Sequence, residues 1–303
     1  MELEEFIQAV ANRLREKLGQ EYHVEAVDVP KNNGVIFHGV SIRHKENNIA
    51  PCIYLDGYYG RYVDEDMEID AAAEEIVRIY RDSAGDIGFD VSLFTDYHNA
   101  RPKLCGRLVN TGKNSGLLKD LPHREFLDLS LIYSVEVCGC DKGIASVLVH
   151  NSHMEQWGVS EKELYQAVAE NMERTDNGTI QNLAQTVAQM AGLEEIPERL
   201  ENDTPPLYIL SNRKRQNGAV QMLNKRMLKT AAKLFGKDFM VLPSSVHEVL
   251  LVPIMEDMEE KDYAVKFANM VREVNDTQVE DTEILSYHVY RYYADTETVV
   301  IAA

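Results

Sequence analysis

Hydrophobic side chains recur at helical spacing in six segments of the chain, with polar residues between them. The first segment predicts an N-terminal helix that Gly19 ends, and its apolar face consists of Leu3, Phe6, Ile7, Val10 and Leu14. Another helix is predicted to begin at Ser160, because Ser160 and Glu163 have the spacing of a capping box. The same periodicity predicts the remaining helices at 69–85, 180–192, 220–236 and 259–275.

Alternation of apolar and polar side chains predicts strands between these helices. In FLDLSLIYSVEV, residues 126–137, every second side chain is apolar, which indicates a half-buried antiparallel strand. The stretch 144–149 follows a glycine-containing turn and is predicted to pair with it as a hairpin. Further strands are predicted at 22–29, 34–42, 103–109, 206–210, 246–252 and 285–293. Helices and strands interleave without regular alternation, so we predict an α+β fold with mixed or antiparallel sheets and packed helices.

Two stretches, 107–133 and 208–253, repeat the same order of features. Each has an apolar strand that ends in an asparagine, a loop with Asn and Gly, then Leu-Pro, a histidine, a glutamate and a strand. This order suggests an internal duplication as a hypothesis. The chain is then interpreted as one α+β unit, 1–303, with an N-terminal segment 1–88 and two similar halves, 89–175 and 204–293.

Polar residues cluster at the ends of the repeated strands, notably in VLPSSVHEVLLVP, residues 241–253. They form either the rim of a cleft or hydrogen-bonding partners of the preceding loops, and the sequence leaves both interpretations open. The residues of this candidate polar cleft are Ser244, Ser245, His247, Glu248, His123, Glu125, Asp128, Asn110 and Asn212.

The sequence contains only weak motifs for nucleophilic or metal-assisted catalysis. Ser245 and His247 lie two residues apart, but no G-x-S-x-G elbow is present, and Asp128 is a candidate for an acid that orients the histidine. No H-E-x-x-H motif occurs. His150 and His153 lie three residues apart and could bind a metal with His123 as a third ligand, but a polar turn after the hairpin strand is the favoured interpretation, and no metal site is predicted. The sequence assigns no cofactor.

Composition fits a globular protein. Of the 303 residues, 45% are hydrophobic and 27% are charged, and no apolar run reaches the roughly 18 residues of a membrane-spanning helix. The N-terminus lacks the features of a signal peptide, so we expect a cytoplasmic protein. The four cysteines are then expected to be reduced thiols without a dedicated role.

A formal net charge of −19 argues against general affinity for nucleic acid. Residues 213–237 nevertheless carry basic side chains and no acidic ones. We expect either that the acidic stretches 64–75 and 256–262 neutralise this segment or that it binds an anion or an acidic partner. Its basic residues are Arg213, Lys214, Arg215, Lys225, Arg226, Lys229, Lys233 and Lys237.

Four blocks carry a family resemblance: PCIYLDGYYGRYVDEDMEIDAAAEEIVRIY, RLVNTGKNSGLLKDLPHREFLDLSLIY, HNSHMEQWGVSEKELYQAVAENM and LPSSVHEVLLVP. In this order they resemble an uncharacterised domain-of-unknown-function family of Gram-positive gut bacteria. The resemblance implies a bacterial intracellular protein and brings no established activity or catalytic residues.

The sequence therefore favours a cytoplasmic binding or regulatory protein that acts through a cleft or surface near His123 and His247. Its partner is an unidentified protein or small molecule, with no membrane involved. The alternative is a hydrolase or metal-dependent enzyme that uses these histidines with nearby carboxylates.

Overall fold

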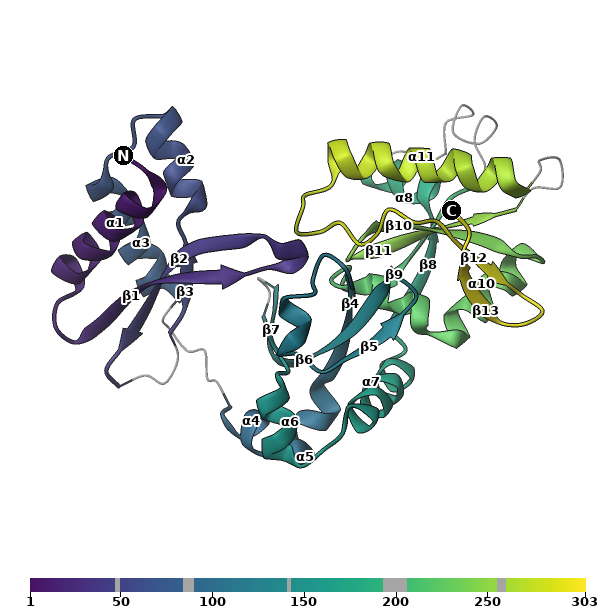
Figure 1. Ribbon diagram of the computed structural model, residues 1–303, viewed down its shortest axis with the longest axis horizontal. Coiled ribbons are helices and arrows are strands. Elements are labelled where there is room, and N and C mark those ends of the chain that lie inside the picture. The colour runs from purple at the N-terminus through teal and green to yellow at the C-terminus, as the bar shows by residue number, and fades with distance from the viewer. Residues whose placement is uncertain (47–49, 84–89, 141–142, 193–205, 255–259) are drawn as a thin grey trace. The chain divides into compact units, whose positions relative to one another are not determined.

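The computed structural model describes residues 1–46, 50–83, 90–140, 143–192, 206–254 and 260–303 (Figure 1). Contacts between residues divide the chain into two compact units, Met1–Asp90 and Val91–Ala303. The predicted α+β class is confirmed, and the strand pairs among the described residues are antiparallel. Within the same residues, no helix is both long and apolar enough to span a bilayer.

The Met1–Asp90 unit is a three-stranded sheet with helices against it. Its elements are α1 (Leu3–Leu18), β1 (Tyr22–Pro30), β2 (Ile36–His44), β3 (Cys52–Tyr54), α2 (Asp56–Asp64) and α3 (Ile69–Ser83), with strand order β1-β2-β3. The predicted apolar face of α1 is buried at Phe6, Ile7, Val10 and Leu14. Gly19 follows α1 with a φ of 80°, a conformation that glycine adopts without strain.

The first sheet of the Val91–Ala303 unit has four strands. Its strand order is β4-β6-β5, and β7 pairs with the remainder of β6. The strands are β4 (Leu104–Asn110), β5 (His123–Phe126), β6 (Leu129–Cys140) and β7 (Gly143–Leu148), and the helices of this region are α4 (Ser92–Thr95), α5 (Tyr97–Ala100), α6 (Asn151–Trp157) and α7 (Glu161–Thr175). The capping box predicted at Ser160 is present, and α7 packs against β4.

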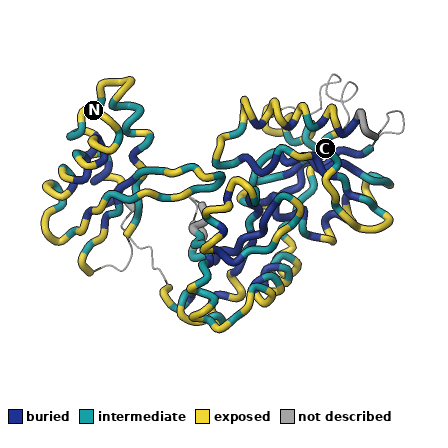
Figure 2. Tube along the Cα trace, in the orientation of Figure 1, coloured by how far each residue is buried: buried dark blue, intermediate teal, exposed yellow. Residues whose placement is uncertain are grey.

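The second sheet of this unit has six strands in the order β13-β12-β10-β11-β9-β8. They are β8 (Gly178–Asn182), β9 (Tyr208–Asn212), β10 (Phe239–Ser245), β11 (Glu248–Pro253), β12 (Tyr290–Tyr293) and β13 (Thr298–Ile301), with the helices α8 (Leu183–Met190), α10 (Lys225–Phe235) and α11 (Glu260–Gln278). α11 covers one face of this sheet, and the other face shares a hydrophobic core with the first sheet and α7. Figure 2 shows buried positions running along the central strands.

The predicted helix at 180–192 begins later than its spacing indicates. Ile180, assigned to its apolar face, lies in β8, which pairs with β9. The helix α8 begins at Leu183, where the Asn182 side chain accepts a hydrogen bond from the backbone N–H of Gln185. This end of the prediction was wrong because pairing with β9 is a long-range interaction that overrides local helical spacing.

Two other boundaries also differ from the sequence pattern. The apolar residues of 218–223 form a short 3-10 helix, η4 (Gly218–Leu223), and α10 begins only after Asn224, whose side chain caps it. The predicted strand at 246–252 begins at Glu248, because His247 lies in the turn between β10 and β11.

Candidate functional site

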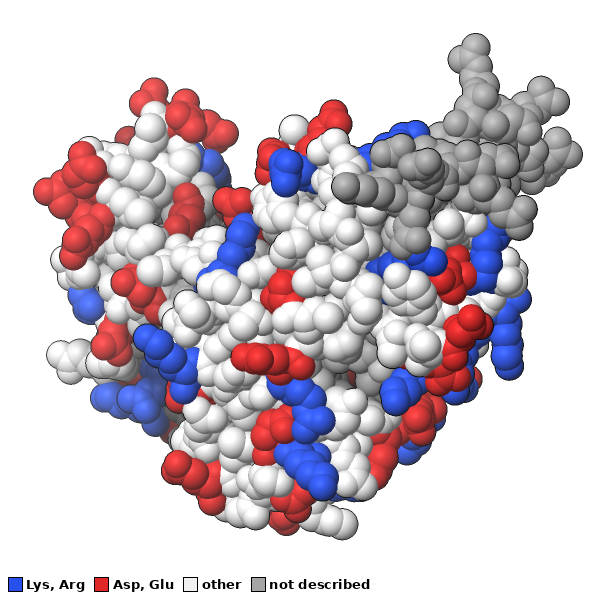
Figure 3. All heavy atoms as spheres, turned by 45° about the vertical axis from the view of Figure 1, so that its right-hand side comes forward, with Lys and Arg blue, Asp and Glu red and all other residues white. Residues whose placement is uncertain are grey.

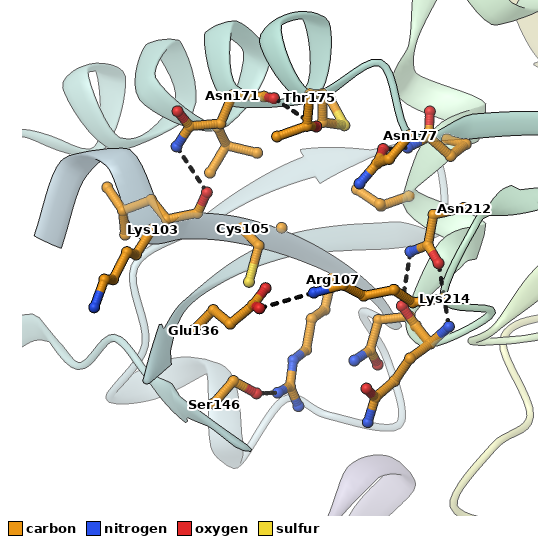
Figure 4. Close-up of a pocket in the computed structure, with 18 of the residues that line it drawn as sticks. Lys103, Cys105, Arg107, Glu136, Ser146, Asn171, Thr175, Asn177, Asn212 and Lys214 are labelled. Atoms are coloured by element: carbon orange, nitrogen blue, oxygen red, sulfur yellow. Dashed lines mark hydrogen bonds and ion pairs between the residues drawn. The ribbon is translucent and has the colours of Figure 1, made fainter. Parts of the chain in front are cut away.

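A pocket of about 430 Å³ opens beside β4 in the Val91–Ala303 unit (Figure 4). In the described sheet β4 is an edge strand, so its free edge has no neighbouring strand. One side of the pocket is formed by β4, β6 and β7, and the rest by α7 and the segment 212–221. Pockets of this volume accommodate metabolite-sized ligands.

Strand register places a group of polar side chains on one face of the first sheet. Cys105 of β4 is paired with Ser134 of β6, and Glu136 of β6 is paired with Ser146 of β7. Side chains alternate along a strand, so Arg107 lies on the same face as Cys105. Apart from Ser134, these residues belong to the pocket lining.

Arg107 is the central cation of this lining. Its Nη2 donates a hydrogen bond to the hydroxyl of Ser146, whereas its Nε is buried and has no hydrogen-bond partner in the described structure. Among the described residues, no carboxylate oxygen lies within 4.0 Å of the guanidinium. Burial lowers the pKa of Arg107, but a guanidinium stays charged in proteins. The pocket therefore contains a partly buried positive charge that has no carboxylate counter-ion in the part of the chain that the structure describes.

Two lysines add positive charge at the same pocket. Lys214 Nζ lies 2.8 Å from Glu136 Oε1, so this pair connects the segment after β9 with β6. Lys103 is an exposed residue of the lining. Glu136 offsets the charge of Lys214, so the positive charges of Arg107 and Lys103 leave the lining with a net positive charge.

Amide side chains on another wall hold one another in fixed orientations. Asn177 Oδ1 accepts a hydrogen bond from Gln221 Nε2 at 3.0 Å, and Gln221 Oε1 accepts one from Asn224 Nδ2 at 2.9 Å. Asn224 in turn accepts the backbone N–H groups of Arg226 and Met227 at the start of α10. Gln221 and Asn224 are buried. This wall of the pocket is therefore preorganised.

The thiol of Cys105 lines the pocket without being activated. Its Sγ donates to the backbone carbonyl of Ser134 at 3.4 Å. Burial raises the pKa of the Cys105 thiol. A thiol of this kind is protonated at neutral pH and is a weak nucleophile.

Of the predicted polar-cleft residues, Asn212 lines this pocket. Asn212 lies at the end of β9 and holds the following loop, because its Nδ2 donates to the carbonyl of Gln216 at 2.8 Å. Asn110, at the end of β4, similarly accepts the backbone N–H of Lys113 at 3.0 Å. Both asparagines thus satisfy loop backbone groups.

The structure places His123 and His247 in different settings, and neither lines the pocket. His123 begins β5, and its Nδ1 donates to the carbonyl of Leu121 at 2.8 Å. Glu125, two residues along β5, is exposed. The duplication of 89–175 and 204–293 stays a prediction.

Ser245 and His247 contact each other through the backbone. The Ser245 hydroxyl accepts the His247 backbone N–H at 3.0 Å, while the ring faces Asn217 and Glu283. The hydroxyl–imidazole hydrogen bond that nucleophilic catalysis uses is not formed between these two side chains. The neighbouring Ser244, in β10, and Glu248, in β11, are half-buried.

Asp128 lies in the turn between β5 and β6 and holds a segment near the C-terminus. Its carboxylate accepts hydrogen bonds from Ser286 Oγ at 2.7 Å, Tyr290 OH at 2.7 Å and His288 Nδ1 at 3.1 Å. The serine hydroxyl donates to the carboxylate and not to the imidazole, so the group lacks the geometry of a catalytic triad. Asp128 is thus an anchor between two distant parts of the chain.

His150 and His153 cap the short helix α6. The backbone N–H of His150 donates to His153 Nδ1 at 3.0 Å, and His150 Nδ1 lies 2.6 Å from Asp120 Oδ2. In the part of the chain that the structure describes, no group of three or more His, Cys, Asp and Glu side chains could hold a metal ion.

Several cations of the basic segment 213–237 have acidic partners in the same unit. Lys214 pairs with Glu136, Arg226 with Asp176, and Lys229 with Glu297. On the face drawn in Figure 3, Lys and Arg side chains are interspersed with Asp and Glu. The three ion pairs neutralise part of the positive charge of the segment 213–237.

The acidic partners differ from those expected. The acidic stretch 64–75 pairs within the Met1–Asp90 unit, where Asp70 contacts Arg13, and Glu75 contacts Arg61. Most of the second stretch, 256–259, lies outside the described residues. Of the other candidate surface residues, Arg215 donates to Gln181, the backbone N–H of Arg213 donates to Asn177, and Lys225 and Lys233 are exposed.

Sequence reasoning missed Arg107 and Ser146. One signal was available, since Arg107 is the one charged residue in the otherwise apolar stretch LCGRLV, residues 104–109. A charged residue in such a strand indicates a polar environment on one face of the sheet. The pairing with Ser146 depends on strand register, which the sequence pattern does not supply.

Comparison with family models finds a match over residues 3–294 to a family of unknown function, DUF5688. Searches among curated proteins and among solved structures find no match.

Proposed function

The chain thus belongs to the DUF5688 family, and we propose that it is a binding or regulatory protein that takes a small organic anion in the pocket beside β4. The observation that carries this proposal is the partly buried guanidinium of Arg107, which has no carboxylate partner among the described residues. Transfer of a charge out of water is costly unless a counter-ion compensates it. A bound anion supplies that counter-ion.

The lining favours an organic acid over an inorganic anion. Apolar side chains of Val137, Val168, Met172 and Val220 lie in the same pocket as Arg107. An inorganic anion satisfies the guanidinium and leaves this apolar surface uncovered, whereas a carboxylate with a hydrocarbon body contacts both. We therefore assign the ligand to the class of small carboxylic acids.

Binding is favoured over catalysis by the state of the reactive groups. Burial raises the pKa of the Cys105 thiol, and Glu136 is engaged by Lys214. Among the lining residues there is no histidine to serve as a general base. The pocket is thus equipped to recognise an anion and lacks an activated nucleophile.

The setting we propose is the cytoplasm of a bacterium. Cys52 and Cys105 are free thiols, as a reducing compartment favours. The formal charge of −19 disfavours general binding to nucleic acid, so the expected ligand is a metabolite.

The test begins with native and denaturing mass spectrometry of the freshly purified protein. A small acid that dissociates on denaturation identifies the ligand directly. Calorimetric titration with acetate, succinate, benzoate and inorganic phosphate then measures binding. Arg107→Gln should weaken binding of the preferred carboxylate by roughly 10- to 100-fold, the loss of one charged hydrogen-bonding group.

Arg226→Gln is the matched control, because it removes the same charge from the surface pair with Asp176 outside the pocket. It should bind as the wild type does. The proposal is wrong if the wild type neither carries a small acid nor binds any of these anions, or if both arginine variants bind equally well.

A further inference from the structure

The β10–β11 turn contacts the pocket loop, residues 213–217, from outside the pocket. The backbone N–H of Asn217 donates to His247 Nδ1 at 3.1 Å, and the backbone N–H of Ala219 donates to the carbonyl of Val246 at 3.2 Å. His247 itself is not part of the lining. The turn thus forms a support behind the loop.

The approach of the two segments is too close for an added methyl group. A Cβ atom at Gly218 would lie 2.1 Å from Ser211 Oγ and 2.5 Å from the carbonyl oxygen of His247. The Ser211 hydroxyl already donates to that carbonyl at 2.7 Å. Gly218, the residue that follows the pocket loop, is therefore packed directly against the turn.

The pocket loop needs support because of its backbone conformation. Arg215 and Asn217 have φ values of 50° and 51°, in the left-handed region that side chains other than glycine adopt at a cost. Asn212 holds the loop at Gln216, and His247 holds it at Asn217. Loss of the second contact removes the hydrogen bond that the His247 side chain makes to the Asn217 backbone, and Asn217 then relaxes more easily toward ordinary backbone angles.

The contact defines the tautomer of His247. A backbone N–H can only donate, so Nδ1 must be unprotonated and Nε2 carries the hydrogen. His247 Nε2 lies 3.3 Å from Glu283 Oε1, where this hydrogen is accepted. Among the described residues Glu283 is the carboxylate within 4.0 Å of the ring, and it favours the required tautomer.

We propose that His247 is a positioning residue for the anion pocket, a role that rests on the binding function proposed above. Its unprotonated Nδ1 accepts the backbone N–H of Asn217, and this hydrogen bond fixes the loop whose residues Lys214 and Gln216 line the pocket. The histidine acts through the loop and does not touch the ligand.

The test compares two substitutions of His247. In His247→Asn, the side-chain oxygen provides an acceptor close to the position of Nδ1, whereas His247→Leu removes the acceptor at similar volume. Calorimetric titration with the carboxylate that the wild type prefers should show roughly tenfold weaker binding for His247→Leu. His247→Asn should recover most of the affinity. Equal weakening in both variants, or unchanged binding in His247→Leu, would overturn the proposal.

Failure of this inference can be told apart from failure of the anion pocket. If the wild type binds and Arg107→Gln does not, the pocket stands, and the His247 variants then test positioning alone. Nitrogen NMR of the folded wild type gives a second readout in case His247→Leu does not fold. The spectrum should show His247 with a hydrogen on Nε2 and none on Nδ1, and a hydrogen on Nδ1 contradicts the proposed role.

Discussion

The carboxylate of Asp128 accepts a hydrogen bond from the hydroxyl of Tyr290 at 2.7 Å, although the two residues are 162 positions apart. Tyr290 is fully buried at the start of β12. Asp128 thereby connects the β5–β6 turn to the six-stranded sheet. A contact between such distant parts of the chain forms only when both sheets are assembled.

Loss of the Tyr290 hydroxyl should destabilise the protein. Tyr290→Phe removes a buried donor to a charged acceptor, and we expect the free energy of unfolding to fall by about 1–3 kcal/mol. Urea unfolding measures this change. Tyr287→Phe is the control, since its hydroxyl donates to Asp276 at an exposed position and should change stability by less than about 0.5 kcal/mol. An equal loss of unfolding free energy in the two variants would show that the buried hydrogen bond from Tyr290 to Asp128 adds no stability beyond that of an exposed one.

Stability should also depend on the ionisation of Asp128. Burial alone would raise the pKa of this carboxyl, but hydrogen bonds from Ser286, Tyr290 and His288 outweigh it and hold the pKa below the ordinary value. A lowered pKa in the folded state means that the stabilisation is present above the unfolded pKa of about 3.9 and is lost as pH falls through the folded value.

The measurement is urea unfolding of wild type and Asp128→Asn over a series of pH values. The variant should be less stable at neutral pH, and the difference should shrink below about pH 4. A difference that is independent of pH would mean that the charge of Asp128 is not what the three donors stabilise.

The sequence predicted most of the elements but not the pocket. Alternation in residues 126–137 predicted the strand that forms β6, but this strand begins at Leu129, so Asp128 lies in the preceding turn. The capping box located the start of α7 at Ser160. These are local signals, with spacings of two and three residues. The partners of Asp128 lie beyond residue 285, and no local pattern indicates them.

The candidate polar cleft illustrates the same limit. The motif around His247 is compatible with a site or with support for the preceding loop, and His247 contacts the Asn217 backbone and the Glu283 side chain. The role of Arg107 was not predicted from the sequence. It depends on neighbouring residues of β6 and β7, which only the pairing register of these strands brings close to Arg107. The sequence shows which side chains could take part in a site, but it does not show which of them lie next to one another in the fold.

Gly218 should not tolerate a side chain. Gly218→Ala places a methyl group against Ser211 Oγ and the His247 carbonyl, and overpacking of this kind costs about 1–3 kcal/mol. Gly116→Ala is the matched control, because no atom lies within 4 Å of its added Cβ and its φ of −69° suits alanine. Thermal unfolding should separate the two variants by several degrees. Similar melting temperatures would contradict the close packing of the pocket loop on the turn.

Cys105 should react slowly in the folded protein. Burial raises the pKa of its thiol, so little of the reactive thiolate is present at neutral pH. Iodoacetamide should therefore modify Cys105 far more slowly in the native protein than in urea, as peptide mass mapping can measure. Cys105→Ala should retain anion binding, because the sulfur donates to the Ser134 carbonyl and leaves Arg107 in place. Rapid alkylation at neutral pH would instead indicate an activated thiol, and the choice of binding over nucleophilic catalysis would then have to be reversed.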